Sequence, residues 1–197
     1  MKIIGLTGSI GMGKTTTANM FKALGCPVFN ADAAVHKLYS RGGKAVPLIR
    51  SVFPDAIIDD SVNRKVLGGH IRADPLNLTV LESFIHPWVG QMRASFLKKA
   101  EKDNARAVIF DVPLLFETNG DKDVDVSVVV TAPADVQKAR VLARPGMTLE
   151  IFNMLLFRQM PDKDKRARAD YIISTGQGLE NARKQVQLIF DKVLNTK

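Results

Sequence analysis

The chain has 197 residues, of which 46% are hydrophobic and 24% charged, as in a typical globular protein of one α/β domain. No stretch approaches the roughly 20 apolar residues needed to span a bilayer, and the single cysteine, Cys26, excludes an intramolecular disulfide. Together these features predict a cytoplasmic protein without membrane contact. The net charge of +8 predicts an acidic partner, either nucleic acid or a polyanionic small molecule.

The first fifteen residues carry a phosphate-binding pattern. Residues 2–7 form a short apolar run rich in β-branched side chains, which predicts a buried parallel strand and not a signal peptide. Residues 8–15 follow at once and fit G-x-x-x-x-G-K-[ST], and residues 16–24 are expected to be helical. Strand, glycine-rich loop and helix in this order predict a P-loop. The alternative is a tight strand–helix turn with a solvated lysine.

The spacing of this loop follows from phosphate chemistry. Its glycines let the backbone approach an anion closely, and the amides at the start of the helix point toward it. Lys14 is expected to reach the β- and γ-phosphates of ATP, and the Thr15 hydroxyl to ligate Mg²⁺. The nucleotide-binding residues predicted here are Gly8, Gly11, Met12, Gly13, Lys14, Thr15 and Thr16.

A carboxylate follows the second predicted strand. Residues 28–30 form this strand, and Asp32 lies just past its carboxyl end, the edge where open parallel sheets bind ligands. A helix is expected over 33–40 and carries His36. Asp32 could instead only cap that helix, and His36 could be a surface or packing residue.

Residues 41–104 have no strong strand pattern and are expected to be mostly helical. Helices are predicted over 63–71, from an Asp74-Pro75 start to residue 84, and over 88–102, with a break at His86-Pro87. Such a long block between two strands predicts an inserted helical subdomain that binds the phosphate acceptor. A helical layer with only a packing role is the alternative.

The second half of the chain alternates strands and helices again. Residues 107–111 form a buried strand ending in Asp111, which resembles a Walker B segment that organises Mg²⁺, although such an aspartate is often only a loop cap. Residues 112–117 are expected to form a loop with exposed apolar side chains. Further strands are predicted over 125–131 and 171–174, with a last helix over 179–194.

Two arginine-rich helices are expected in between. One starts at Pro133, residues 144–146 break it, and Thr148 caps the next, which runs to about residue 160. Residues 138–168 are therefore predicted to be a lid that closes over phosphates and excludes water. This basic stretch lacks an interleaved aromatic platform for stacking bases, so nucleic acid is not expected as a partner.

With these residues laid out, the chain resembles the dephospho-CoA kinases over nearly its whole length. The discriminating segments are His86-Pro87 and the run from Asp111 to Glu117, whereas the P-loop is shared by many families. The resemblance also includes 30–36, Gln137 with Arg140 and Arg144, 158–161 and 169–173. It implies a P-loop kinase fold with a five-stranded parallel sheet flanked by helices, a helical CoA-binding subdomain of about 41–104 and the lid.

The same resemblance implies a reaction and residue roles. ATP would phosphorylate the ribose 3′-hydroxyl of dephospho-CoA, the last step of coenzyme A biosynthesis, with Mg²⁺ as cofactor. Asp32 would be the general base, Lys14, Arg140 and Arg144 would act on the phosphoryl group, and Thr15 and Asp111 would hold the metal. The adenine strip would be Ser174, Thr175 and Gly176, and substrate would contact Asp32, His36, His86, Leu114, Phe116 and Glu117.

The chain departs from the family pattern at Ser9, Asn30 and Pro145. Asn30 replaces the first Asp of an Asp-Ala-Asp triplet, which removes any duty shared by two carboxylates. The rival functions are another small-molecule kinase, a P-loop GTPase and a nucleic-acid-stimulated ATPase. The GTPase interpretation lacks support because no guanine-reading Asn-Lys-x-Asp pattern occurs. The ATPase interpretation is supported only by the positive net charge. A monomer is expected.

Overall fold

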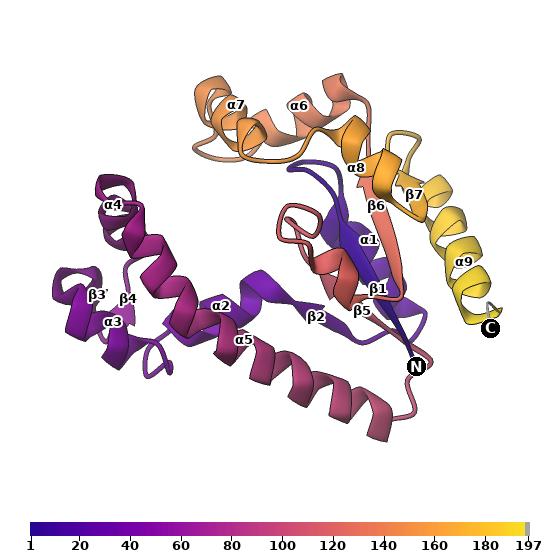
Figure 1. Cartoon of the computed structure of the whole chain (residues 1–197). Coiled ribbons are helices and arrows are strands. Elements are labelled where there is room, and N and C mark those ends of the chain that lie inside the picture. The colour runs from indigo at the N-terminus through magenta and orange to yellow at the C-terminus, as the bar shows by residue number, and fades with distance from the viewer. Residues whose placement is uncertain (196–197) are drawn as a thin grey trace. The chain divides into compact units, whose positions relative to one another are not determined.

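The computed structural model describes residues 1–195 and contains the predicted five-stranded parallel sheet (Figure 1). Its strands run in the spatial order β2-β5-β1-β6-β7. β1 lies at the centre and pairs in parallel with β5 on one side and β6 on the other. The strands are β1 (Lys2–Thr7), β2 (Val28–Asn30), β5 (Ala107–Asp111), β6 (Val126–Thr131) and β7 (Tyr171–Ser174).

Strand order explains why the phosphate-binding loop lies where it does. The chain passes from β1 to the edge strand β2, returns to β5 beside β1, and then crosses to β6 on the opposite side of β1. Ligands of open α/β sheets bind outside the carboxyl ends of the strands at such a change of direction. The loop that follows β1 occupies this position.

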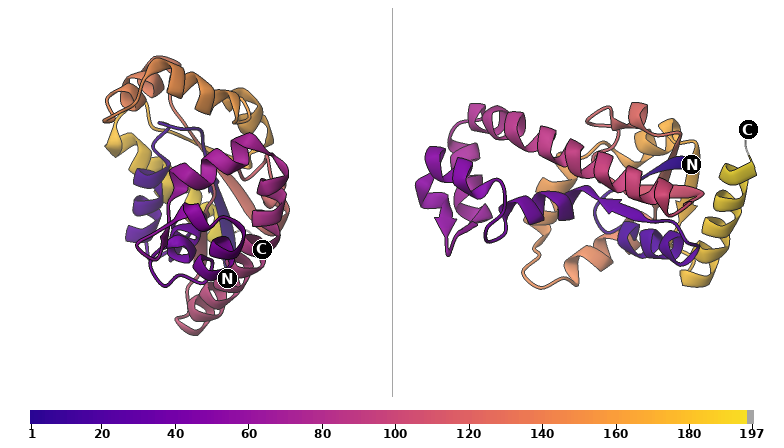
Figure 2. Two further views of the ribbon diagram at one scale, coloured as in Figure 1. Left: turned by 90° about the vertical axis from the view of Figure 1, so that its left-hand side faces the viewer. Right: turned by 90° about the horizontal axis from the view of Figure 1, so that it is seen from below.

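The central strands are continuous apolar runs because helices cover the sheet. Ile4 and Leu6 of β1, Ile109 of β5 and Val128 of β6 are completely buried. α1 (Lys14–Ala23) and α9 (Leu179–Asn195) pack against each other beside this core (Figure 2). α9 was predicted from its helical apolar spacing, and its apolar stripe is buried.

The chain divides into two compact units, one of Met1–Phe29 with Ala100 onward and one of Asn30–Lys99. The second unit holds α2 (Ala31–Tyr39), α3 (Val46–Val52), a 3₁₀ turn (Pro54–Ala56), α4 (Arg64–Ala73) and most of α5 (Leu76–Lys102). It has its own hydrophobic core, built from residues such as Leu38, Ile49, Leu67, Leu81 and Ile85. It begins earlier than the predicted subdomain of 41–104, whose role stays a prediction.

The predicted helix break at His86-Pro87 is wrong. α5 is one helix of 27 residues with Pro87 inside it, and the right-hand view in Figure 2 shows it as one continuous helix. Proline removes one backbone hydrogen bond and costs about 3 kcal/mol in a helix interior. Leu81 and Ile85 before the proline and Trp88 after it all pack into the second core, and this burial keeps the helix continuous.

A β-hairpin in the second unit was also missed. β3 (Ile57–Ile58) and β4 (Ser61–Val62) pair antiparallel, and Asp59 and Asp60 connect them with φ of 48° and 57°. Two successive residues with positive φ are the signature of a type I′ turn, for which aspartate is one of the tolerated residues. Each strand has only two residues, too few to show an alternating pattern.

The region predicted as the lid contains three helices instead of two. α6 (Ala134–Leu142) and α7 (Leu149–Phe157) are present, and the Thr148 hydroxyl caps α7 as predicted by accepting the Ile151 N–H. α8 (Asp162–Arg168) was not predicted, and a 3₁₀ turn (Gly120–Asp123) precedes β6. Among the described residues, no helix is long and apolar enough to cross a membrane.

Candidate active site

The glycine-rich loop has a backbone that requires glycine at two positions. Gly11 and Gly13 have φ of 78° and 95°, in the left-handed region that other residues rarely adopt. A Cβ on Gly11 would lie 2.4 Å from Val141 Cγ2, and one on Gly13 would lie 3.2 Å from Thr175 Oγ1. The loop is therefore enclosed by α6 and by the segment after β7.

α1 begins at Lys14, two residues earlier than predicted, and presents its amino terminus to the loop. Gly13 is the N-cap and supplies no side-chain hydrogen bond, so the amides of the first turn lack a side-chain cap. Such amides, with the helix dipole, bind phosphate. Thr15 and Thr16 are exposed in this turn, while the Met12 side chain is buried, leaving its backbone to contribute to the loop.

Lys14 and Asp111 form an ion pair at the carboxyl end of the sheet. Asp111 ends the fully buried strand β5, as predicted, and its side chain is 3% exposed against 15% for Lys14. Charges this enclosed are stable only when paired. The pair thus lies enclosed at the carboxyl end of β5, beside the phosphate-binding loop.

The segment after β7 is tied to the loop through Thr175. Thr175 Oγ1 donates to the Met12 carbonyl at 2.7 Å and accepts from Arg140 Nη1 at 2.8 Å. Arg140 Nη2 donates to the Thr175 carbonyl, also at 2.8 Å. Arg140 thereby binds the predicted adenine strip by two parallel bonds, while Arg144, after the end of α6, is exposed.

The two neighbours of Thr175 are also held in place. The Ser174 backbone N–H donates to Gln185 Oε1 of α9 at 2.9 Å, and Gln185 Nε2 donates to the Ser174 carbonyl at 3.0 Å. A Cβ on Gly176 would lie 2.5 Å from Pro133 Cδ, so only glycine fits there. Gln185 was not among the predicted site residues, because nothing in the local sequence relates it to a segment eleven residues away.

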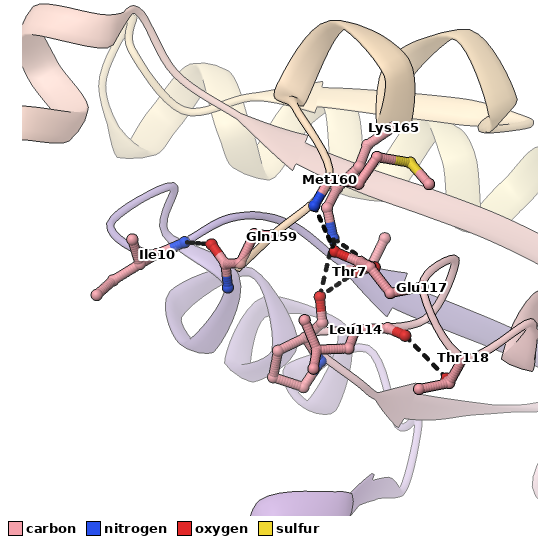
Figure 3. A network of polar contacts seen from close by, with 9 residues as sticks. Thr7, Ile10, Leu114, Glu117, Thr118, Gln159, Met160 and Lys165 are labelled. Carbon is pink, nitrogen blue, oxygen red and sulfur yellow. Dashed lines mark hydrogen bonds and ion pairs between the residues drawn. The ribbon is translucent and has the colours of Figure 1, made fainter. Parts of the chain in front are cut away.

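Ile10, in the middle of the loop, is held by two glutamine side chains. Its N–H donates to Gln159 Oε1 at 3.0 Å (Figure 3), and its carbonyl accepts from Gln137 Nε2 at 2.7 Å. Gln137 lies on α6, and Gln159 lies between α7 and α8. The conformation of the phosphate-binding loop thus depends on residues far along the chain.

The predicted description of 112–117 as an exposed apolar loop is wrong. Leu114 is 39% exposed, but Leu115 and Phe116 are only 1% and 2% exposed. The Phe116 ring lies under the Arg168 guanidinium, 4.7 Å from its centroid. Glu117 accepts the Met160 N–H and pairs with Lys165, so its carboxylate is engaged within the protein (Figure 3).

In the second unit, the predicted acceptor residues are exposed on helices. Asp32 and His36 are one helical turn apart on α2, hence on one face, and His86 is exposed in the middle of α5. The alternative in which Asp32 caps the helix is wrong. The Asn30 side chain is the cap and accepts the Ala33 N–H at 2.7 Å.

Asn30 therefore has a structural explanation, since asparagine caps helices about as well as aspartate. α2 begins at Ala31, so Asp32 sits in its first turn, where a negative charge is favourable.

The described residues contain no group of three or more His, Cys, Asp or Glu side chains placed to hold a metal. Mg²⁺ does not need one, because it commonly uses one or two protein ligands together with phosphate oxygens and water. The exposed Thr15 hydroxyl and the Asp111 carboxylate fit this donor set.

Comparison with known proteins identifies the family. The model of the family described as dephospho-CoA kinase matches residues 2–181. The chain belongs to the dephospho-CoA kinase family. Curated dephospho-CoA kinases from Mesorhizobium japonicum and Agrobacterium fabrum are 50% and 49% identical to it over 193 residues. These matches cover 98% of this chain and 97% and 98% of the two relatives.

Solved structures share the fold of this chain. A crystal structure from Thermus thermophilus covers 99% of this chain and 98% of its own, with 29% identity and a TM-score of 0.88. A dephospho-CoA kinase from Campylobacter jejuni shares the fold, with 22% identity, a TM-score of 0.70 and coverage of 97% and 96%. Shikimate kinase from Acinetobacter baumannii is more distant, at 18% identity and a TM-score of 0.54 over 100% and 95% of the two chains.

Proposed function

We propose that this chain transfers the γ-phosphoryl group of ATP to the ribose 3′-hydroxyl of dephospho-CoA, giving coenzyme A and ADP. The family match over residues 2–181 carries the proposal, and the P-loop with its Lys14–Asp111 pair supplies the chemistry. The reaction is the last step of coenzyme A biosynthesis. Its cytoplasmic location and the monomeric state stay predictions from the sequence.

The phosphate-binding loop holds the triphosphate of ATP. Backbone amides from Gly11 to Thr15 and the start of α1 surround the phosphates, where a positive partial charge is fixed in advance. Lys14 exchanges its bond to Asp111 for the β- and γ-phosphate oxygens. The strip of Ser174, Thr175 and Gly176 packs against the adenine. Gly8, Met12 and Thr16 complete the nucleotide site.

Asp111, once separated from Lys14, and the Thr15 hydroxyl hold Mg²⁺. Held there, Mg²⁺ would supply positive charge that offsets the negative charge developing on the phosphates during transfer. This division of roles uses each partner of the ion pair for a different part of the same ligand.

Asp32 accepts the proton of the 3′-hydroxyl as the phosphoryl group arrives, so the acceptor oxygen attacks as an alkoxide-like nucleophile. Its carboxylate is exposed and the helix cap is supplied by Asn30, which leaves Asp32 available for this role. His36, His86 and Leu114 contact the acceptor. Arg144 stabilises the transferring group, with Arg140 contributing from its place beside Thr175.

The test is to incubate the protein with ATP, Mg²⁺ and dephospho-CoA and to detect coenzyme A by mass. Shikimate and a panel of nucleosides serve as alternative acceptors. ADP release is expected to be slow with ATP alone and to accelerate strongly with dephospho-CoA. Equal ADP release without any acceptor, or a faster reaction with another acceptor, would contradict the proposal.

A further inference from the structure

Lys165 is a lysine with no solvent exposure, on the short helix α8. Lysine is almost never fully buried unless its charge is paired. Its ammonium group lies 2.8 Å from Glu117 Oε1 and 3.0 Å from Oε2, and it donates to the Pro113 carbonyl at 3.0 Å. The buried Lys165 ammonium therefore binds the segment that follows β5 at two residues, Pro113 and Glu117.

The same acceptors bind two further segments of the chain. Glu117 Oε1 accepts the Met160 N–H at 2.9 Å (Figure 3), and the Pro113 carbonyl accepts the Thr7 hydroxyl at 3.0 Å. Thr7 is the last residue of β1, immediately before the phosphate-binding loop. The Lys165–Glu117 pair thus joins α8, the segment 113–117, the end of β1 and Met160.

Met160 connects this pair to the loop itself. Its neighbour Gln159 accepts the Ile10 N–H, as described above. Because the two residues are adjacent, a bond that fixes the Met160 backbone also limits where the Gln159 amide can lie. The side-chain oxygen of Gln159 (Oε1) then orients Ile10 and, with it, the phosphate-binding loop.

A second contact of α8 is independent of this route. Arg168, three residues after Lys165, stacks over Phe116 and binds Asp121 Oδ2 at 2.9 Å. It holds α8 against the same stretch of chain through Phe116 and Asp121, not through a hydrogen bond or ion pair with Glu117, Met160 or Gln159. Arg168 is thus a matched control for effects that come only from loosening α8.

We infer that the Lys165–Glu117 pair is a positioning element for phosphoryl transfer, which orients the phosphate-binding loop through Met160, Gln159 and Ile10. This assignment rests on the proposed function, and it gives Glu117 a role other than contact with substrate. Neither charge needs to touch ATP or the acceptor. A displacement of about 1 Å in a positioning group can cost about 10²-fold in rate, so a remote bond is sufficient to affect turnover.

The test uses variants that leave no charge buried alone. The double variant Lys165→Met/Glu117→Gln removes both charges but keeps an amide oxygen for the Met160 N–H. We expect kcat to fall about 10- to 100-fold and the Kd for ATP to rise at least about threefold. The KM for dephospho-CoA should stay within about threefold of wild type. A higher KM for dephospho-CoA with kcat retained would instead make Glu117 a substrate contact and overturn the inference.

The bond from the Ile10 N–H to Gln159 Oε1 is tested by Gln159→Met, which keeps the side-chain length but has no side-chain oxygen. It should lower kcat by a similar factor, and adding it to the double variant should cost no more than about a further twofold, because both changes weaken the same route. Fully additive losses would overturn the inference. Gln187→Met, at an exposed position of α9, is the matched control and should retain wild-type kcat.

Arg168→Leu separates positioning from general loosening. It should lower the melting temperature and leave kcat unchanged at temperatures where the variant is folded. An equal loss of kcat in Arg168→Leu and the double variant would overturn the inference. If the double variant does not fold, Gln159→Met decides, and wild-type kcat in that variant is the contradicting result.

Failure of the proposed function is recognised separately, because the wild-type protein would then bind ATP and form no coenzyme A. The Kd for ATP still tests the positioning role in that case. An unchanged Kd in both the double variant and Gln159→Met would overturn the inference.

Discussion

The two compact units hold their predicted functional side chains in opposite ways. In the unit that contains the sheet, Lys14, Arg140 and Glu117 are each engaged by an internal partner. In the unit of Asn30–Lys99, Asp32, His36 and His86 are exposed on helix surfaces. The difference indicates that the predicted phosphate-binding residues are held in place before substrate binds, whereas the predicted acceptor residues lie exposed on helix surfaces.

Preorganisation has a reason in the chemistry of phosphoryl transfer. Positioning and electrostatic stabilisation supply most of the catalysis in such enzymes, and fixed dipoles and charges require no rearrangement during the reaction. A proton acceptor has a lesser geometric demand, because it needs only hydrogen-bond reach of the hydroxyl. Variants in the first unit should therefore have larger effects than variants in the second.

The largest effect is expected for Lys14→Ala. It removes the cation that the loop offers to the phosphates and breaks the ion pair with the buried Asp111, so coenzyme A formation should fall below detection. Lys22→Ala, in the last turn of the same helix, is the exposed control and should retain activity. Activity of Lys14→Ala within about tenfold of wild type, roughly 1.4 kcal/mol in barrier terms, would contradict the P-loop assignment.

A smaller loss is expected for Asp32→Asn. A general base contributes about 10²–10⁴ in rate, so kcat should fall by that factor. Folding and ATP affinity should persist, because Asn30 and not Asp32 caps α2.

Asn30→Asp is the control for Asp32→Asn. Since aspartate caps as well as asparagine, the melting temperature should not change and kcat should stay within a few-fold of wild type. If Asp32→Asn retains kcat within a few-fold of wild type, another group accepts the proton. The contrast between the two units would then not hold for the unit of Asn30–Lys99.

Added salt is expected to have a weaker effect than these substitutions, and to change only the binding of substrates. If the net charge of +8 attracts polyanionic substrates, the KM values for ATP and dephospho-CoA should rise a few-fold with ionic strength. The screening length falls from about 10 Å at 0.1 M to about 3 Å at 1 M salt, which removes long-range attraction. Stimulation of ATP hydrolysis by DNA or RNA would instead support the nucleic-acid-dependent ATPase.

The smallest effect on activity is expected at Cys26, which lies in the core of the first unit, 1% exposed. Burial raises its pKa from 9.0 to about 11, so the folded protein should react with a thiol reagent far more slowly than the unfolded protein. The unfolded thiol loses its proton first as pH rises, and the contribution to stability is complete below pH 9.0. It is lost toward pH 11, by at most about 3 kcal/mol.

The Cys26 prediction is checked by urea unfolding at pH 8 and pH 11 for the wild type and Cys26→Ala. A smaller loss of stability between the two pH values is expected for the variant. Rapid labelling of the native protein at pH 8 would contradict the buried position.

Much of the sheet could be predicted because its signals are local. β1, β5 and α9 follow from apolar runs or helical spacing, and the P-loop follows from a spacing that phosphate chemistry requires. The family could also be identified from short segments such as 111–117. The two-residue strands of the hairpin carry too little pattern to be predicted, and α8 is a basic heptapeptide without an apolar stripe.

The fold class, the phosphate-binding loop and the family could all be predicted from local sequence patterns, because each depends on residues that are close together in the chain. Tertiary structure decided that α5 continues through Pro87, because burial on both sides of the proline outweighs one lost hydrogen bond. It also decided that Arg140 binds Thr175 and that Lys165 and Glu117 pair. Arg140 lies 35 residues from its partner and Lys165 lies 48 from its own, and no local pattern carries such information.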